Sequence, residues 1–330
     1  MPENQPRFIH LRTHSEHSLL EGAVPVKKLI GLTKDAGMPA VALTDTNAMF
    51  AALEFSVKAL DEGVQPIVGC QITLDLGGAK GGVVALAQNR AGWMNLMAMS
   101  SSMYLRKDGQ PVHITESELA ERSEGLILLT GGAEGPIGRL IRAGDAAGAE
   151  AAMKRLHATF GDRLYVEIQR HKDESGRVME AEAATEEEFI RLAYALELPL
   201  VATNDVYFPK PEMFEAHDAL ICIAERAYVD QSQPRRRLTP NHDFKSPEEM
   251  AVLFADLPEA IENTVEIARR CAFAVAKHKP ILPRFADDEV EELRRQARDG
   301  LAARLAIIPH AVPVEEYNAR LDFELGIIEQ

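Results

Sequence analysis

The sequence predicts an α/β protein, a distorted (β/α)7 barrel of the TIM kind with a helical C-terminal extension. Three observations favour this fold. Short β-rich runs alternate with longer helical patterns along most of the 330 residues. Most of the strand runs are apolar throughout, which is typical of parallel strands covered by helices on both faces. Seven strand runs at uneven spacing favour a barrel over an open doubly wound sheet.

Strands and helices are expected in alternation up to about residue 272. Residues 39–45 (PAVALTD) illustrate the strands, because the run is apolar until its polar end. Residues 25–37 (PVKKLIGLTKDAG) illustrate the helices, since the segment is helical in pattern and stops at a glycine. The strands are expected at 8–12, 39–45, 65–74, 83–89, 125–130, 164–169 and 198–205. The helices are expected at 25–37, 48–63, 91–105, in two stretches within 135–160, at 178–197, and after the strand at 198–205 up to about residue 272.

A domain boundary is predicted near residues 276–286, where two prolines and a shift in charge interrupt the pattern. We therefore expect residues 1–275 to form the barrel domain. Residues 276–330 should form a linker and two helices, at 287–306 and 314–330, that are less densely packed. The last helix reaches the end of the sequence without a capping residue, so we expect a fragment of a longer chain.

The charge balance bears on the class of partner. The sequence has 36 basic and 51 acidic residues, a formal net charge of −15. Such a surface repels phosphate backbones at long range, which opposes non-specific binding of nucleic acid by the whole protein. The tract Arg235, Arg236 and Arg237 is the local exception, and it is either a solvated loop or a contact for nucleic acid or an acidic partner.

Several features predict a cytoplasmic protein with no membrane contact. No apolar run approaches 18 residues, the length that a spanning helix requires. The first ten residues lack the basic and apolar regions of a signal peptide. Three widely spaced cysteines are compatible with a reducing compartment.

Polar side chains follow nearly every predicted strand, and in such barrels the C-terminal strand ends carry the chemistry. They belong either to a pocket, active or vestigial, or simply to solvent-facing loops. His10, Arg12 and His14 alternate, so their side chains leave one face of the first strand. Arg12 cannot bind a metal because it stays protonated. His14 and Asp45 are each either metal ligands or hydrogen-bonded pocket residues.

The chain resembles the N-terminal PHP (polymerase and histidinol phosphatase) domain of bacterial replicative DNA polymerase III alpha subunits. The matching stretches run in order over residues 7–272, and their order and spacing make the resemblance specific. They are RFIHLRTHSEHSLLEGA, GMPAVALTDTNAMFAALEF, PIVGCQITL, GLILLTGGAEG, LYVEIQRH, LPLVATNDVYF, EAHDALICI, FKSPEEMAVLF and NTVEIARRC. Residues 276–330 look like the start of the polymerase palm region, without the catalytic aspartates that lie further along.

The resemblance implies a distorted (β/α)7 barrel whose active members hold a metal cluster with nine ligands. These positions fall on Arg12, His14, Asp45, Thr46, Gln71, Gly82, Gly132, Asp205 and Tyr207. Only His14, Asp45 and Asp205 keep a residue that binds metals. Three scattered ligands beside a guanidinium cannot assemble a two-metal hydrolytic site. We therefore expect a vestigial metal pocket with no catalytic residue and no metal.

The resemblance also implies a role. We expect an inactive scaffold within the polymerase, docking a separate proofreading 3′–5′ exonuclease subunit of the epsilon type. The whole polymerase would bind primer–template DNA and use Mg²⁺, whereas this segment should need no cofactor. Two alternatives stay open: an active metal-dependent phosphoesterase or pyrophosphatase, and direct contact with template DNA.

One expectation concerns the vacated metal pocket. If Asp45 and Asp205 point into one pocket, their carboxylates repel each other without a cation. Arg12 offers a planar fork of donors suited to carboxylates. We expect Arg12 to bond Asp45, Asp205 or both in place of the metal charge; the alternative is that it turns outward and water fills the space.

Overall fold

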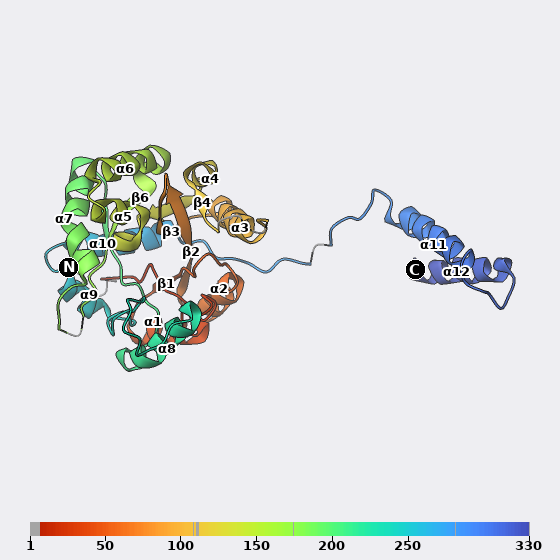
Figure 1. Cartoon of the computed structure of the whole chain (residues 1–330), viewed down its shortest axis with the longest axis horizontal. Helices are drawn as coiled ribbons and strands as arrows, with labels where there is room; N and C mark the ends of the chain where they lie inside the picture. The colour runs from red at the N-terminus through yellow and green to blue at the C-terminus, as the bar shows by residue number, and fades with distance from the viewer. Residues whose placement is uncertain (1–6, 108, 110–111, 174, 281, 330) are drawn as a thin grey trace. The chain divides into compact units, whose positions relative to one another are not determined.

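The computed structural model describes residues 7–107, 109, 112–173, 175–280 and 282–329. Two predictions fall partly outside the described residues. They are the end of the last expected helix, at Gln330, and the absence of a signal peptide from the N-terminus, at residues 1–6. The chain divides into two units, Met1–Lys277 and His278–Gln330 (Figure 1). Each unit is described below by itself.

The first unit is built on a mixed sheet with helices around it. The strands follow one another in the order β1, β2, β3, β5, β6, β7, and β4 pairs with β2. Their bounds are β1 Ala40–Leu43, β2 Gln65–Leu76, β3 Ala79–Ala87, β4 Ile114–Thr115, β5 Leu126–Leu129, β6 Leu164–Ile168 and β7 Leu200–Ala202. The β1–β2, β5–β6 and β6–β7 pairs are parallel. The continuous apolar runs thus correctly predicted buried, largely parallel strands.

One strand runs against this direction. β3 pairs antiparallel with both β2 and β5, and β2 and β3 form a hairpin. Gly77 and Gly78 both have positive φ, 71° and 105°, which lets the chain reverse over a tight turn. The connection between these two expected strands is therefore a tight turn, too short to hold a crossover helix, which is why the strands are antiparallel.

Residues 8–15 close the barrel, although the expected strand at 8–12 is not a regular strand and the isolated bridges of this segment lie at Thr13 and Ser15. On one side, Ala42 N–H donates to His10 O (2.8 Å) and Thr44 N–H to Thr13 O (2.9 Å). On the other side, His14 N–H donates to Val206 O (2.9 Å) and Val206 N–H to Arg12 O (3.3 Å). The segment therefore lies between β1 and the end of β7 and makes the sheet a distorted barrel.

Helices cover the outside of the barrel (Figure 1). Their bounds are α1 Val26–Asp35, α2 Ala52–Asp61, α3 Arg90–Tyr104, α4 Glu116–Glu121, α5 Pro136–Arg142, α6 Ala146–Phe160, α7 Glu180–Ala195, α8 Phe214–Glu225, α9 Pro247–Leu253 and α10 Pro258–Arg270. Short 3-10 turns lie at Gly132–Glu134, Gly161–Arg163 and Pro211–Met213. Asn89, Thr115 and Ser246 cap α3, α4 and α9 with their side chains. These side chains satisfy backbone N–H groups in the first turns of their helices.

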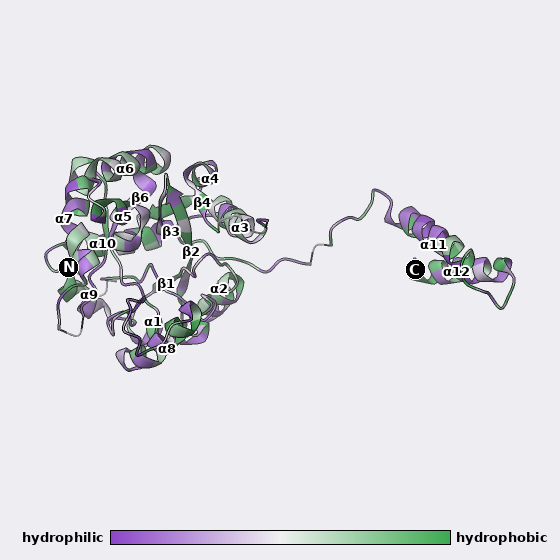
Figure 2. Ribbon diagram, viewed as in Figure 1, coloured by the Kyte–Doolittle hydropathy of each residue, from purple (hydrophilic) through white to green (hydrophobic). Residues whose placement is uncertain are grey.

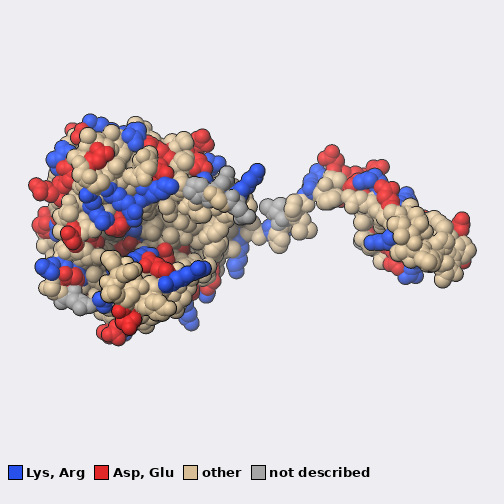
Figure 3. Space-filling model, in the orientation of Figure 1, with Lys and Arg blue, Asp and Glu red and all other residues tan. Residues whose placement is uncertain are grey.

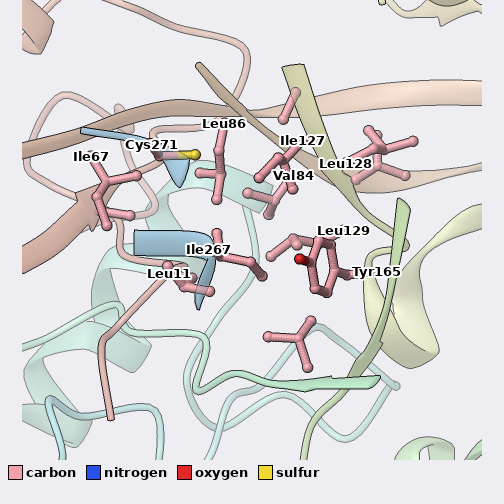
Figure 4. Close-up of a cluster of buried hydrophobic side chains, with 14 of the residues drawn as sticks. Leu11, Ile67, Val84, Leu86, Ile127, Leu128, Leu129, Tyr165, Ile267 and Cys271 are labelled. Carbon is pink, nitrogen blue, oxygen red and sulfur yellow. The ribbon is translucent and has the colours of Figure 1, made fainter. Parts of the chain in front are cut away.

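The core of the first unit lies between the sheet and these helices. Figure 4 shows part of it, where Leu11, Val84 and Leu129 pack beside Ile267 of α10. All of these side chains are buried. Because α10 contacts β7 and carries Ile267 into this cluster, the last helix of the unit holds the barrel together.

The second unit consists of two helices, α11 Glu289–Leu305 and α12 Val314–Ile328. In the described part of this unit, α11 buries no residue and α12 buries only Leu325. Arg298 Nη2 donates to Asp322 Oδ1 (3.0 Å) and joins the two helices. Apolar and polar residues are mixed along both helices (Figure 2), and apolar side chains such as those of Leu293 and Phe323 are exposed. Among the described residues, no helix is long and apolar enough to cross a membrane.

Candidate functional site: a cavity closed by an arginine

The carboxyl ends of the strands surround a cavity of about 630 Å³ in the first unit. Six of the nine expected site positions line it: Arg12, Thr46, Gln71, Gly82, Asp205 and Tyr207. His14 and Asp45 are buried beside it, and Gly132 lies against the side chain of Gln169. The structure thus gathers most of the expected positions, and their origin as a metal site stays a prediction.

Arg12 reaches into this cavity, as expected, and is buried there. Its Nη2 donates to Gln71 Oε1 (2.6 Å), and its Nη1 donates to Glu167 Oε1 (3.2 Å) and Gly131 O (3.4 Å). Its Nε lies 3.1 Å from Asp205 Oδ1. That N–H has no hydrogen-bond partner, so the contact with Asp205 is an ion pair without a hydrogen bond. The guanidinium of Arg12 therefore forms ion pairs with two carboxylates, those of Glu167 and Asp205.

The electrostatics of this cluster keep it charged. Burial opposes the charge of Arg12, but the carboxylates of Asp205 and Glu167 outweigh it and raise the pKa of Arg12. Burial likewise opposes the charge of Asp205, but Arg12 and His14 outweigh it and hold the pKa of Asp205 far below its usual range. Each charge is thus stabilised by its partner, and loss of one leaves the other buried and unpaired.

Asp45 does not belong to this cluster. Its Oδ1 accepts from Ser15 N–H (2.7 Å) and from Ser18 Oγ (2.7 Å), and its Oδ2 accepts from Ser15 Oγ (2.8 Å). These bonds turn the carboxylate toward the loop after residue 14 and away from the cavity. The expectation that Asp45 and Asp205 share one pocket is therefore wrong, and Arg12 pairs with Asp205 alone of the two.

His14 is buried beside the cavity and forms a hydrogen bond to Asp205. Its Nε2–H donates to Asp205 Oδ1 (2.9 Å), and its ring stacks on Tyr207 with centroids 4.3 Å apart. Burial and the carboxylate of Asp205 raise the pKa of Tyr207, so its phenol stays protonated. His14 is thus a buried hydrogen-bonding residue, one of the two interpretations that the sequence left open.

Two further residues shape the cavity and were missing from the expected site. Glu167 is fully buried and also accepts from Gly131 N–H (2.9 Å) and Thr203 Oγ1 (2.5 Å). Glu21 lines the cavity and accepts from Thr46 Oγ1 (2.8 Å). A charged residue inside the apolar run LYVEI was the available signal for Glu167. Glu21 stands in an irregular loop, where no period signals its direction.

A stacked pair of histidines forms another part of the wall. The rings of His171 and His242 lie 3.8 Å apart and nearly parallel. Asp205 N–H donates to Nε2 of His171 (3.2 Å), and Nδ1–H of His171 donates to Glu182 Oε1 (2.6 Å). Burial lowers the pKa of His242 well below its usual value. Both ring nitrogens of His171 are therefore used within the protein.

The residues of the cavity do not fit a metal cluster. A Cβ added at Gly82 would lie 3.1 Å from the side chain of Gln71, and one at Gly132 would lie 2.5 Å from Gln169. No group of three His, Cys, Asp or Glu side chains among the described residues could hold a metal ion. The guanidinium of Arg12 adds a fixed positive charge where a cation would have to bind. The cavity is better described as a site closed by an internal ion pair.

The arginine tract lines the same cavity, and all three of its members make ion pairs within the protein. Arg235 makes two hydrogen bonds to the carboxylate of Asp218 (2.6 and 2.7 Å). Arg236 Nη1 donates to Glu21 (3.3 Å), and its Nη2 donates to the Tyr207 hydroxyl (3.3 Å). Acidic and basic side chains are interspersed on the face of the first unit seen in Figure 3. These bonds therefore hold the loop that carries the tract against the barrel, and the tract does not form a separate basic patch.

The sequence of the chain matches a protein family and several known proteins. Residues 10–171 match the model of a family described as PHP domain. The chain is 49% identical to the DNA polymerase III subunit alpha of Caulobacter vibrioides over 336 residues, which cover 98% of this chain and 29% of that protein. It is 35% identical to the protein of the same name from Escherichia coli, over 99% of this chain and 29% of that protein. The chain thus spans less than a third of the length of these curated relatives.

Solved structures show a more distant likeness. One is an amidohydrolase from Chromobacterium violaceum with bound sulfate and no metal, at 14% identity and a TM-score of 0.36. It is matched over 64% of this chain and 96% of that chain. Another is a two-domain protein from Bacteroides vulgatus that contains a predicted PHP-like metal-dependent phosphoesterase, at 11% identity and a TM-score of 0.35. It is matched over 80% of this chain and 69% of that chain.

Proposed function

Residues 10–171 belong to the PHP domain family, and from this premise we propose that the chain is a hydrolytically inactive scaffold of a DNA polymerase III alpha subunit. The identity of 49% over nearly the whole chain supports the assignment to that subunit. In this role the barrel supports the rest of the polymerase and docks a partner.

The observation that carries the loss of hydrolysis is the position of Arg12. Metal-dependent hydrolysis of a phosphoester needs cations that activate water and neutralise developing charge. Here Glu167 and Asp205 are engaged by the guanidinium, and Asp205 also accepts from His14. A cation entering this site would meet a charge of its own sign and carboxylates already paired. The geometry therefore favours a structural ion pair over a hydrolytic centre.

Metal analysis coupled to hydrolysis tests this proposal. The purified chain is equilibrated with Mn²⁺ or Zn²⁺, dialysed, and analysed for bound metal and for hydrolysis of p-nitrophenyl phosphate and pyrophosphate. We expect well under one metal ion per chain and no metal-dependent hydrolysis above that of an Asp205→Asn variant. A stoichiometric metal, with hydrolysis that the Asp205→Asn substitution abolishes, would establish the phosphoesterase or pyrophosphatase alternative.

The docking role concerns proofreading. A polymerase whose PHP barrel lacks nuclease activity needs a 3′–5′ exonuclease from another chain, so we assign the epsilon-type exonuclease subunit as the docked partner. Calorimetric titration of this chain with the exonuclease subunit of the same holoenzyme is the test, and saturable one-to-one binding is expected. Failure to bind under conditions where both proteins are folded would remove this part of the proposal.

The remaining assignments follow from the polymerase relatives. Primer–template DNA is the substrate of the whole subunit, Mg²⁺ its cofactor, and the cytoplasm its location. The net charge of −15 argues against DNA contact by this segment alone. A salt-dependent affinity of this chain for primer–template DNA would contradict that argument.

A further inference from the structure

A second and larger cavity, of about 990 Å³, lies between α7 and α9 and shares no lining residue with the closed site. Figure 1 shows these two helices on the same side of the first unit. One wall is a single face of α7, because its residues are spaced by three and four. That face consists of Ala183, Glu186, Glu187 and Ile190. The opposite wall is Glu248, Glu249, Val252 and Leu253 of α9. We call this cavity the α7–α9 groove.

The groove exposes apolar surface that the barrel does not cover. Val252 is 79% exposed, and Val178, Ile190 and Leu253 are only half-buried. Apolar area left in water lacks the stabilisation of about 25 cal/mol per Å² that burial supplies. A contiguous apolar patch rimmed by charge is typical of a surface that binds another protein. The volume is at the upper end of ligand pockets, roughly 300–1,000 Å³.

The charges of the groove indicate the chemistry of its occupant. Two of its three cations are engaged within the protein. Arg170 makes hydrogen bonds to Glu186 and Asp256, and Lys245 Nζ lies 2.6 Å from Asp243 Oδ1. Lys172 is the third. In the described part of the chain, Glu187, Glu248 and Lys172 have no ion-pair partner, so the unpaired charges of the rim are net negative.

We propose that the α7–α9 groove binds an amphipathic protein segment that carries Lys or Arg beside its apolar side chains. Such a segment would lay its apolar side chains along Val178, Ile190 and Val252, in the manner of a helix in a groove. Its cations would meet Glu187 and Glu248 at the rim. This inference rests on the proposed docking role, and it locates the surface and the chemistry of the docked segment.

A matched pair of substitutions tests the position. Val252→Arg places a cation in the groove, and Ile223→Arg makes the same kind of change on α8, where Ile223 is 67% exposed. The exonuclease subunit is titrated into the full chain and each variant. We expect Val252→Arg to weaken binding at least about tenfold, as the loss of a central contact does, and Ile223→Arg to change it less than about twofold.

A second variant tests the chemistry. Glu187→Gln with Glu248→Gln keeps the shape of the rim and removes two charges. We expect weaker binding and a shallower dependence of the affinity on salt, because fewer charges are screened. An unchanged affinity and salt dependence would overturn the assignment of a basic segment.

The outcomes separate the two proposals. Equal binding by the wild-type chain and Val252→Arg overturns the groove and leaves docking elsewhere on the domain. Absence of binding by the wild-type chain overturns the docking role and the groove with it. Should Val252→Arg fail to fold, hydrogen exchange decides: protection of α7 and α9 in the wild-type complex supports the groove, and protection confined to other elements overturns it.

Discussion

Arg12 and Glu167 meet inside the barrel, with Nη1 of Arg12 3.2 Å from Oε1 of Glu167 and side chains that are 5% and 0% exposed. This pair joins the segment that closes the barrel to β6. Glu167 in turn accepts from Gly131 and Thr203, so one carboxylate connects three strand ends. The closed site is therefore part of what holds the barrel together.

Removal of the Arg12 side chain should destabilise the protein strongly. Arg12→Ala leaves the carboxylates of Glu167 and Asp205 buried without their cation, so we expect a loss of about 3–5 kcal/mol in the free energy of unfolding. Urea denaturation measures it. Arg177→Ala, at a largely exposed arginine, is the control and should stay within about 0.5 kcal/mol. An Arg12→Ala variant as stable as the wild type would contradict the ion-pair description.

Gly131 should tolerate no side chain. Its φ is +91°, and an added Cβ would lie against the carbonyl oxygen of Gly82. Gly144 is the matched control, because its φ is +78° and an added Cβ would meet nothing within 4 Å. We expect Gly144→Ala to cost about 1 kcal/mol for the backbone conformation, and Gly131→Ala about 1–3 kcal/mol more for the clash. Equal melting temperatures for the two variants would show that the backbone at Gly131 moves freely.

His10 should make the stability depend on pH. Burial lowers the pKa of His10 to about 4, and its Nε2–H donates to Lys245 O (2.9 Å). Between pH 6.5 and 4 the unfolded chain binds a proton at His10 that the folded chain does not, so stability falls as the pH falls through this window. The contribution is about 2 kcal/mol between pH 7 and 5. In His10→Gln the dependence of unfolding on pH should be flatter; the same slope in both proteins would assign it to other groups.

Arg235 should hold the loop that lies over the cavity. Its bidentate pair with Asp218 attaches residues 228–240 to α8. In Arg235→Ala we expect faster hydrogen exchange in this loop, with α7 unchanged as the internal control. Asp218→Ala should give the same result, and the double variant should be no worse than either single variant. Additive effects of the two substitutions would mean that the residues act separately.

The sequence predicted the parts of this fold whose signal is local. Apolar runs located β1, β2, β5, β6 and β7, because burial on both faces leaves the same pattern wherever the strand lies. The hairpin between β2 and β3 escaped prediction, since a buried antiparallel strand has the same composition as a parallel one. The segment 8–15 carries the residues of a strand, but its bonds go to partners far along the chain.

The candidate site, like the fold, could be predicted only in part from the sequence. The family resemblance, together with the alternation of His10, Arg12 and His14, predicted that Arg12 reaches into the cavity, and Arg12 lines it. Asp45 follows a strand just as Asp205 does, but its carboxylate accepts from the backbone N–H of Ser15 and from the hydroxyls of Ser15 and Ser18. Such a choice depends on three-dimensional neighbours that no spacing in the sequence reveals.

The closure of the barrel by residues 8–15 has a consequence for synthesis on the ribosome. His14 bonds to Asp205, a residue 191 positions later in the chain, so residues 8–15 leave the ribosome long before their partner at the end of β7. A contact of such long range requires the chain to lose the entropy of a long loop before the contact stabilises it, and this loss slows folding. Until about residue 206 has emerged, residues 8–15 can pair with β1 but lack their second neighbour, the end of β7. The nascent barrel is therefore an open sheet for most of its translation, exposed to wrong strand pairing and dependent on its last strand to become a closed domain.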